Sequence, residues 1–283
     1  SDVLYFALED SDGRIKSRIQ KIKDDNDFPE SLYYATECNT LSNGLEEEIE
    51  HALQSHPDIK LVVFDTMQYI RSGKRKGNET AYQTDYNEMK DIKNIASKYD
   101  LGVLLVHHNR KAVDLSDPFA NISGTYGIQG AMDCMMVLNK YKNNDKQTVL
   151  SICGRDIVND QYVLEFDADN GMWLLAGTMQ QCNEKKLLDE YYNSPILQNI
   201  LFLVEEGLGK WRGRVSEIIE YSKKTNIKID DNPMTVSQEM RRYKTLLEKE
   251  NNIIINVIKN GSGSNLYEFK DNSGFFEYAS QGQ

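Results

Sequence analysis

Four short apolar runs, separated by stretches with helical periodicity, constrain the fold of this chain more than any other feature of its sequence. Such runs are typical of strands that are buried on both faces of a parallel sheet. They are Val3–Leu8, Leu32–Ala35, Leu61–Phe64 and Val103–Val106, and the amphipathic stretches among them are Gly13–Ile22, Leu45–Leu53 and Tyr86–Tyr99. This alternation predicts an α/β fold with a mostly parallel sheet covered by helices.

A different pattern begins beyond Gly130, where short polar links join four further apolar segments. Links of this length favour antiparallel pairing of the strands that they connect. The segments are Cys134–Leu138, Thr148–Cys153, Tyr162–Phe166 and Met172–Leu175. We therefore expect antiparallel strands at one edge of the parallel sheet, within a first domain that covers residues 1–178.

Residues 194–271 have the element order of a smaller second domain. A helical pattern begins at Pro195, two more cover Val215–Tyr221 and Val236–Glu250, and Ile253–Lys270 contains two strands around a Gly/Ser turn. Three helices followed by a β-hairpin is the order of a winged-helix domain. Residues 179–193 are expected to form a linker, and residues 272–283 a mobile tail.

The net charge of −11 argues against a surface coated with basic residues for nucleic acid. The charge is uneven, however, because residues 208–244 hold nine basic and five acidic side chains. Phosphate contacts are short-ranged at physiological salt, so a local basic stretch matters more than the total charge. No apolar run reaches the length of a membrane span. The four cysteines lack metal-ligand spacing, which is typical of a reduced, cytoplasmic protein.

Polar residues follow the third apolar run, in the segment "IKLVVFDTMQYI". Ligands of open α/β sheets bind beyond the carboxyl ends of the strands, which is where Asp65 and Thr66 stand. A carboxylate at this place can hold Mg²⁺ through its water shell. The alternative interpretation is a strand that merely ends in a helix-capping aspartate.

The fourth apolar run ends in a longer polar segment, in "LGVLLVHHNRK". Several polar groups in succession at a strand end cannot all face the core. Adjacent side chains of an extended chain also point to opposite sides, so His107 and His108 have different surroundings. Both are candidate site residues, against the alternative of structural histidines. A zinc site is a poor alternative, because no cysteine or further histidine stands at ligand spacing.

Taken in order, the strand ends "FALED", "VVFDT" and "LVHHNRK" resemble those of the RecA-like P-loop ATPases. The resemblance is to the hexameric replicative helicases of the RepA and DnaB kind and to the AAA-type ATPases of phages and plasmids, and it covers about residues 1–175. It implies a RecA-like sheet, with ATP and Mg²⁺ as cofactors. It also implies a ring-shaped homo-oligomer that hydrolyses ATP between subunits to move single-stranded DNA in replication.

The resemblance also implies roles for individual residues. Glu9 matches the glutamate that activates water, Asp65 matches the Walker B aspartate that binds Mg²⁺, and His108 matches a sensor of the γ-phosphate. Arg155 matches a basic finger that reaches the nucleotide of a neighbouring subunit. The second-choice or supporting nucleotide-site residues are Asp10, Thr66, His107 and Lys140.

Two loops match those that line the central channel of the ring and touch single-stranded DNA, Arg71–Gln83 and Lys111–Thr125. In the second domain the third helix would contact duplex DNA, unless the domain binds a replication protein instead. The predicted DNA contacts are Arg71, Lys74, Arg75, Lys76, Arg110 and Lys111 in the first domain, and Arg241, Arg242 and Lys244 in the second.

The phosphate-binding loop of this family, G-x-x-x-x-G-K-[ST], does not occur in the 283 residues. The nearest segment, "SGKRKGNET", lacks both the first glycine and the hydroxyl residue after the lysine. We expect the loop to precede Ser1 in the native protein, and this chain alone to be inactive as an ATPase. The alternative is a non-catalytic DNA-binding or assembly protein that uses the RecA-like scaffold as a platform.

Overall fold

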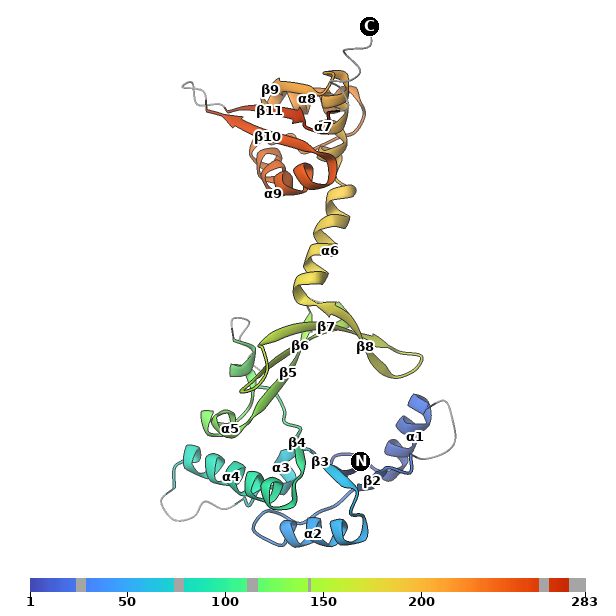
Figure 1. Cartoon of the computed structure of the whole chain (residues 1–283), viewed down its shortest axis with the longest axis vertical. Coiled ribbons are helices and arrows are strands. Elements are labelled where there is room, and N and C mark those ends of the chain that lie inside the picture. The colour runs from blue at the N-terminus through green and yellow to red at the C-terminus, as the bar shows by residue number, and fades with distance from the viewer. Residues whose placement is uncertain (24–28, 74–78, 111–116, 142–143, 260–264, 275–283) are drawn as a thin grey trace. The chain divides into compact units, whose positions relative to one another are not determined.

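The computed structural model describes residues 1–23, 29–73, 79–110, 117–141, 144–259 and 265–274. The chain divides into two compact units, residues 1–179 and 180–283 (Figure 1). Among the described helices, none combines the length and the apolar character that crossing a membrane requires.

The first unit contains a four-stranded parallel sheet in the order β2-β1-β3-β4. Its strands are β1 (Asp2–Ala7), β2 (Leu32–Ala35), β3 (Ile59–Asp65) and β4 (Gly102–Leu105), and the helices along this part of the chain are α1 (Asp12–Lys23), α2 (Leu45–Ser55), α3 (Met67–Ile70) and α4 (Ala81–Tyr99). Every apolar run coincides with a strand and every amphipathic stretch lies within a helix, so this part of the prediction is confirmed.

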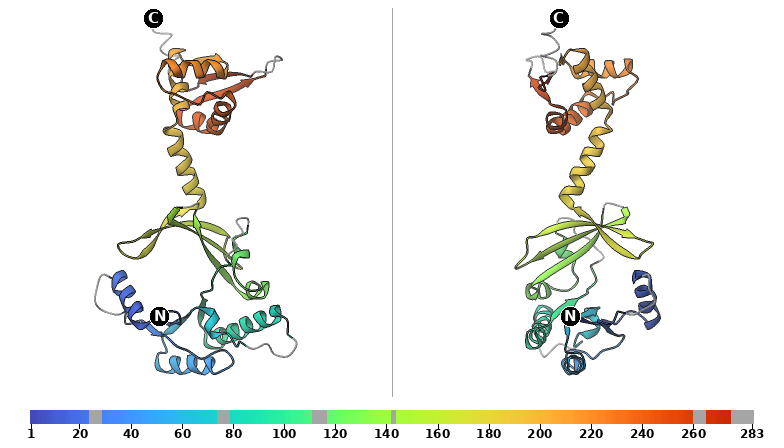
Figure 2. Two further views of the ribbon diagram at one scale, coloured as in Figure 1. Left: turned by 180° about the vertical axis from the view of Figure 1, so that it is seen from behind. Right: turned by 45° about the vertical axis from the view of Figure 1, so that its right-hand side comes forward.

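Apolar side chains of the parallel sheet, α2 and α4 form the core of the first unit. Phe6 of β1 and Phe64 of β3 are buried, and their stacked rings have centroids 5.0 Å apart. From α4, the buried residues Met89, Ile92 and Ile95 follow the helical spacing of the sequence. Figure 2 shows α2 and α4 beside the strands. Each such burial contributes about 1.5–3 kcal/mol, and together they hold the strand ends in register.

A second, antiparallel sheet follows in chain order, made of β5 (Cys134–Tyr141), β6 (Asn144–Gly154), β7 (Asp160–Asp167) and β8 (Met172–Thr178). The four strands were predicted, but their placement at an edge of the parallel sheet is wrong: over the described residues they form a sheet of their own. Over the described residues, β4 pairs with β3 and β5 pairs with β6, and no ladder joins the two sheets. Between β4 and β5 the chain forms a 3₁₀ turn (Pro118–Asn121) and α5 (Tyr126–Ala131), and Asn109 pairs with Ile122.

The second unit packs helices against a three-stranded antiparallel sheet in the order β10-β11-β9. Its elements are α6 (Met179–Tyr192), α7 (Pro195–Glu206), β9 (Lys210–Gly213), α8 (Val215–Lys224), α9 (Pro233–Asn251), β10 (Ile253–Ile258) and β11 (Leu266–Asp271). The core includes Ile200 of α7, Ile218 of α8, Met240 of α9 and Phe269 of β11, all fully buried. The three predicted helices and the hairpin are confirmed.

Two features of the second unit differ from the expectation. β9 was not predicted; it pairs with β11, where Trp211 stacks on Phe269 with ring centroids 5.3 Å apart. The expected linker is largely the helix α6, whose Tyr191 is buried in the core of this unit. Of the expected tail, only residues 272–274 lie among the described residues, and the predicted domain boundaries stay predictions.

Candidate active site

The carboxyl ends of β1, β3 and β4 meet at one edge of the parallel sheet. Ala7 of β1 lies opposite Asp65 of β3, and Phe64 of β3 lies opposite Leu105 of β4. The backbone N–H of Leu8 donates to the carbonyl of Asp65 at 2.7 Å, which extends this register by one residue beyond β1. The polar segments that follow the three strands are therefore brought together, as the sequence predicts for a ligand site.

Glu9 is the centre of a small polar cluster at this edge. Its Oε1 accepts a hydrogen bond from the Thr66 hydroxyl at 3.2 Å and lies 3.1 Å from Nε2 of His108. Thr66 is buried, whereas the side chains of Glu9 and His108 are 39% and 68% exposed. The carboxylate is thus oriented by a buried hydroxyl while solvent still reaches it, which is the arrangement that a general base for water requires.

Asp65 stands next to this cluster and is oriented from the opposite side. The Tyr5 hydroxyl donates a hydrogen bond to its Oδ2 at 2.8 Å. Burial, this hydrogen bond and the Asp65 charge all raise the pKa of Tyr5, so the phenol stays a proton donor. The site offers two carboxylates and the Thr66 hydroxyl, and oxygen donors of this kind fit a hydrated magnesium ion.

Asp10 differs from Glu9 in its surroundings. Its carboxylate forms ion pairs with Arg14 at 3.2 Å and with Arg18, both on α1, and its side chain is only 9% exposed. The Asp10 carboxylate is therefore paired with two guanidinium groups, while the Glu9 carboxylate contacts Thr66 and His108. This geometry favours Glu9 over Asp10 as the residue that contacts water, and the assignment stays a prediction.

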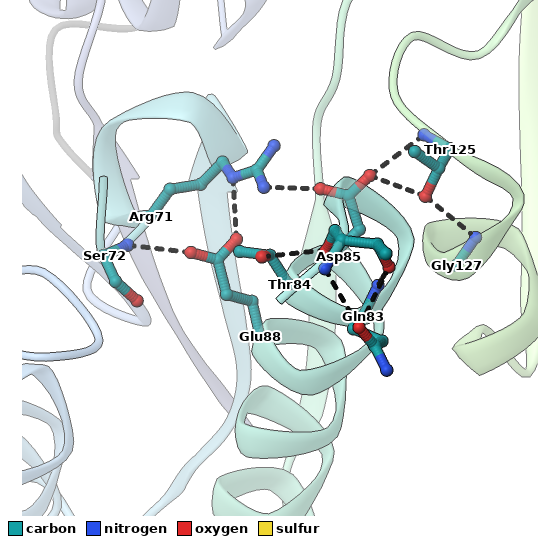
Figure 3. A network of polar contacts seen from close by, with 9 residues as sticks. Arg71, Ser72, Gln83, Thr84, Asp85, Glu88, Thr125 and Gly127 are labelled. Atoms are coloured by element: carbon teal, nitrogen blue, oxygen red, sulfur yellow. Dashed lines mark hydrogen bonds and ion pairs between the residues drawn. The ribbon is translucent and has the colours of Figure 1, made fainter. Parts of the chain in front are cut away.

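A network around Arg71 joins the segment after β3 to α4 and α5 (Figure 3). The Arg71 guanidinium contacts Oδ1 of Asp85 at 2.5 Å and Oε2 of Glu88 at 2.7 Å. The other oxygen of Asp85 accepts hydrogen bonds from the backbone and hydroxyl of Thr125, at 3.0 and 2.7 Å. Asp85 and Glu88 are buried, and they share the single positive charge of Arg71.

The network also determines the protonation of its members. Burial by itself would raise the pKa of Asp85, but the hydrogen bonds from Thr125 and Arg71 outweigh it and lower that pKa. Sequence reasoning missed Asp85, Glu88 and Thr125, and assigned Arg71 to DNA. In the structure the Arg71 guanidinium is engaged by two carboxylates, and its predicted contact with DNA stays a prediction.

His107 lies on the other side of the chain from His108 and is partly buried. Burial lowers its pKa, and the positive charges of Arg71 and His108 lower it further. Its imidazole is therefore neutral at pH 7. His107 is partly buried and His108 is exposed, so the two histidines have different surroundings, as the sequence predicts.

The lowered pKa of His107 makes stability depend on pH. The unfolded chain binds the proton near pH 6.5 and the folded chain only below that, so folding is favoured above pH 6.5 and weakened as the pH falls. We expect wild-type protein to lose more unfolding free energy between pH 7.5 and 5.5 than the His107→Gln variant, measured by urea denaturation. Equal losses would assign the pH dependence to other groups.

The structure also locates those remaining candidates that lie among the described residues. Arg155 follows β6 and pairs with Asp133 at 3.4 Å, and Lys140 is an exposed residue of β5. Arg110 is exposed and donates to the carbonyl of Gly124 at 2.6 Å. On α9, Arg241 and Lys244 are exposed and Arg242 pairs with Glu190 of α6. Four candidates lie outside the described residues: Lys74, Arg75, Lys76 and Lys111.

Comparison with known proteins finds a match for the first part of the chain. Residues 1–114 match a family model described as an AAA domain. The matched residues include β1 to β4, and with them Glu9, Asp65 and His108, whereas Lys140 and Arg155 lie outside the match. No curated protein matches the chain.

Among solved structures, one described as a DnaB-like replicative helicase and its interactions with primase is similar to this chain. The sequence identity is 15%, the TM-score is 0.49, and the match covers 62% of this chain and 50% of the other. The chain thus spans about half the length of that structure.

Proposed function

We propose that the AAA domain is the catalytic part of a DNA-dependent ATPase of the replicative-helicase type. The observation that carries the proposal is the Glu9 carboxylate, which is oriented by Thr66, lies beside His108 and follows the strand next to Asp65. In this role Glu9 accepts a proton from the attacking water. His108 contacts the γ-phosphate, and its hydrogen bond to Glu9 links phosphate contact to the base.

The oxygen donors at the strand ends fit Mg²⁺, with Asp65 acting through the water shell and Thr66 beside it. Bound with ATP, the ion neutralises charge on the phosphates. The other phosphate contacts would come from a G-x-x-x-x-G-K-[ST] loop, which does not occur within the 283 residues. Arg155, with Lys140 as second candidate, would reach the nucleotide of a neighbouring subunit in a ring-shaped homo-oligomer.

DNA contacts belong to both units in this proposal. Single-stranded DNA would meet the loops within Arg71–Gln83 and Lys111–Thr125, and Arg110 beside the second loop. The second unit has the order helix, strand, two helices and hairpin, which supports a winged-helix assignment. The third helix of that motif is α9, which carries the predicted contacts to duplex DNA: Arg241, Arg242 and Lys244. A replication protein is the alternative partner of this unit.

The test compares two proteins, the chain of residues 1–283 and the same chain extended upstream to include the phosphate-binding loop. We expect ATP hydrolysis by the extended protein only, with a rate that single-stranded DNA raises severalfold. The measurement is phosphate release at saturating ATP with and without oligonucleotide. DNA binding without any hydrolysis by the extended protein would contradict the proposal and favour the non-catalytic platform.

A further inference from the structure

The second unit contains a cavity of about 370 Å³ between the start of α8, the start of α9 and β11. Its polar lining includes Arg214, Ser216, Ser237, Arg241 and Asn265, and Tyr267 forms part of its wall. Two of its lining residues, Val215 and Tyr267, belong to the buried core of the unit. None of its lining residues carries a carboxylate.

Some basic residues of the second unit are paired with carboxylates, and the two arginines of the cavity are not among them. Arg242 pairs with Glu190, Lys223 pairs with Asp231 at 3.0 Å, and Lys249 lies 3.8 Å from Glu250. In the part of the chain that the structure describes, no carboxylate pairs with the side chain of Arg214 or Arg241. On a protein of net charge −11, two guanidinium groups that share a cavity without an acidic partner indicate a site for an anion.

The acidic groups nearest in sequence are already engaged. Glu217 of α8 accepts a hydrogen bond from the backbone N–H of Arg214 at 3.1 Å. Asp230 accepts from the backbone of Asn232 at 2.7 Å, and Asp231 pairs with Lys223. Over the described residues, none of these three carboxylates forms an ion pair with Arg214 or Arg241.

Local packing places the two arginines. A Cβ at residue 213 would lie 2.6 Å from the ring of Trp211, so glycine lets the backbone pass close to this ring at the end of β9. Arg214 follows directly, as the residue just before α8. On α9, Met240 and Tyr243 are buried in the core, and Arg241 is exposed between them in sequence. Arg242 is turned by about 100° from Arg241 on the helix, and it pairs with α6.

We infer that this cavity binds a backbone phosphate of duplex DNA, with Arg214 and Arg241 as the charged contacts and Ser216 and Asn265 as hydrogen-bond donors. Guanidinium groups bind phosphate oxygens with two parallel hydrogen bonds, and hydroxyl and amide groups complete such contacts in protein–DNA interfaces. The inference rests on the proposed DNA-binding role of the second unit, and it adds Arg214, which lies outside the predicted contacts on α9.

The test measures binding of a fluorescein-labelled duplex to residues 1–283 by anisotropy, at several salt concentrations. Arg214→Ala and Arg241→Ala should each weaken binding about tenfold at low salt, and each should reduce the slope of log K against log salt by about 1. Lys249→Ala, a matched loss of one positive charge from α9, should change affinity by less than about twofold. Equal losses of affinity for Lys249→Ala and Arg241→Ala would overturn the site, because binding would then depend on the total positive charge of α9 and not on the position of Arg241.

Two further outcomes distinguish a failure of this inference from a failure of the proposed function. If both arginine variants bind duplex normally but lose binding of inorganic phosphate, measured by calorimetry on the same chain, the cavity holds free phosphate and the inference is wrong. If wild-type chain binds no duplex at low salt, the DNA role of the second unit fails as well. The ATPase proposal is tested at the strand ends of the first unit and would be unaffected by either result.

Discussion

Replacing Glu9 by glutamine should slow ATP hydrolysis by about 10²–10⁴-fold in a protein that includes the phosphate-binding loop, because the variant lacks the base that accepts a proton from water. ATP binding should remain, since glutamine keeps the size of the side chain and an oxygen that can accept the Thr66 hydrogen bond. Single-turnover hydrolysis and binding of a fluorescent ATP analogue measure the two effects separately.

Asp10→Asn is the matched control for Glu9→Gln, because it makes the same chemical change at the adjacent residue. Asp10 is engaged by Arg14 and Arg18, so its loss should leave the rate of hydrolysis within a few fold of wild type. The assignment would be wrong if Asp10→Asn lost hydrolysis and Glu9→Gln did not.

Arg71→Ala should destabilise the first unit by about 3–5 kcal/mol, because it leaves two buried carboxylates without their positive partner. Asp85 and Glu88 have side chains that are only 6% and 7% exposed, so water cannot readily replace the guanidinium. The measurement is the free energy of unfolding from urea denaturation at pH 7, followed by a signal from the first unit.

Lys93→Ala serves as the control for Arg71→Ala. Lys93 also forms an ion pair in the first unit, with Asp133 at 2.7 Å, but both side chains are exposed. Exposed pairs contribute about 0–1 kcal/mol, so this variant should unfold almost as wild type does. If the two variants lose the same stability, the Arg71 network is not the buried structural element that its geometry indicates.

The elements of this fold are predictable from sequence where the signal is local. Buried strands such as Leu61–Phe64 and the periodic apolar positions Met89, Ile92 and Ile95 of α4 are encoded within a few residues. The strand ends with Glu9, Asp65 and His108 follow from the same signal, since parallel strands bring their carboxyl ends to one edge.

The features that sequence reasoning missed depend on contacts between distant segments. Asp85 and Glu88 are three residues apart on α4 and look like part of a solvated face; only Arg71 and Thr125, from other elements, make them a buried site. β9 is four residues long and contains two charges, so it has no strand signal until β11 pairs with it. The separation of the two sheets is likewise a matter of pairing between distant segments, because β4 pairs with β3 and β5 pairs with β6.

The most direct test of the central claim, that the ends of β1, β3 and β4 form an ATP-hydrolysing site, is Mg²⁺-dependent ATP turnover by the loop-containing protein and its Asp65→Asn variant. We expect Mg²⁺-dependent hydrolysis in the wild type and a loss of about 10²-fold or more in the variant, with the fold unchanged by circular dichroism. Equal turnover by both proteins would contradict it, because Asp65 would then take no part in the chemistry.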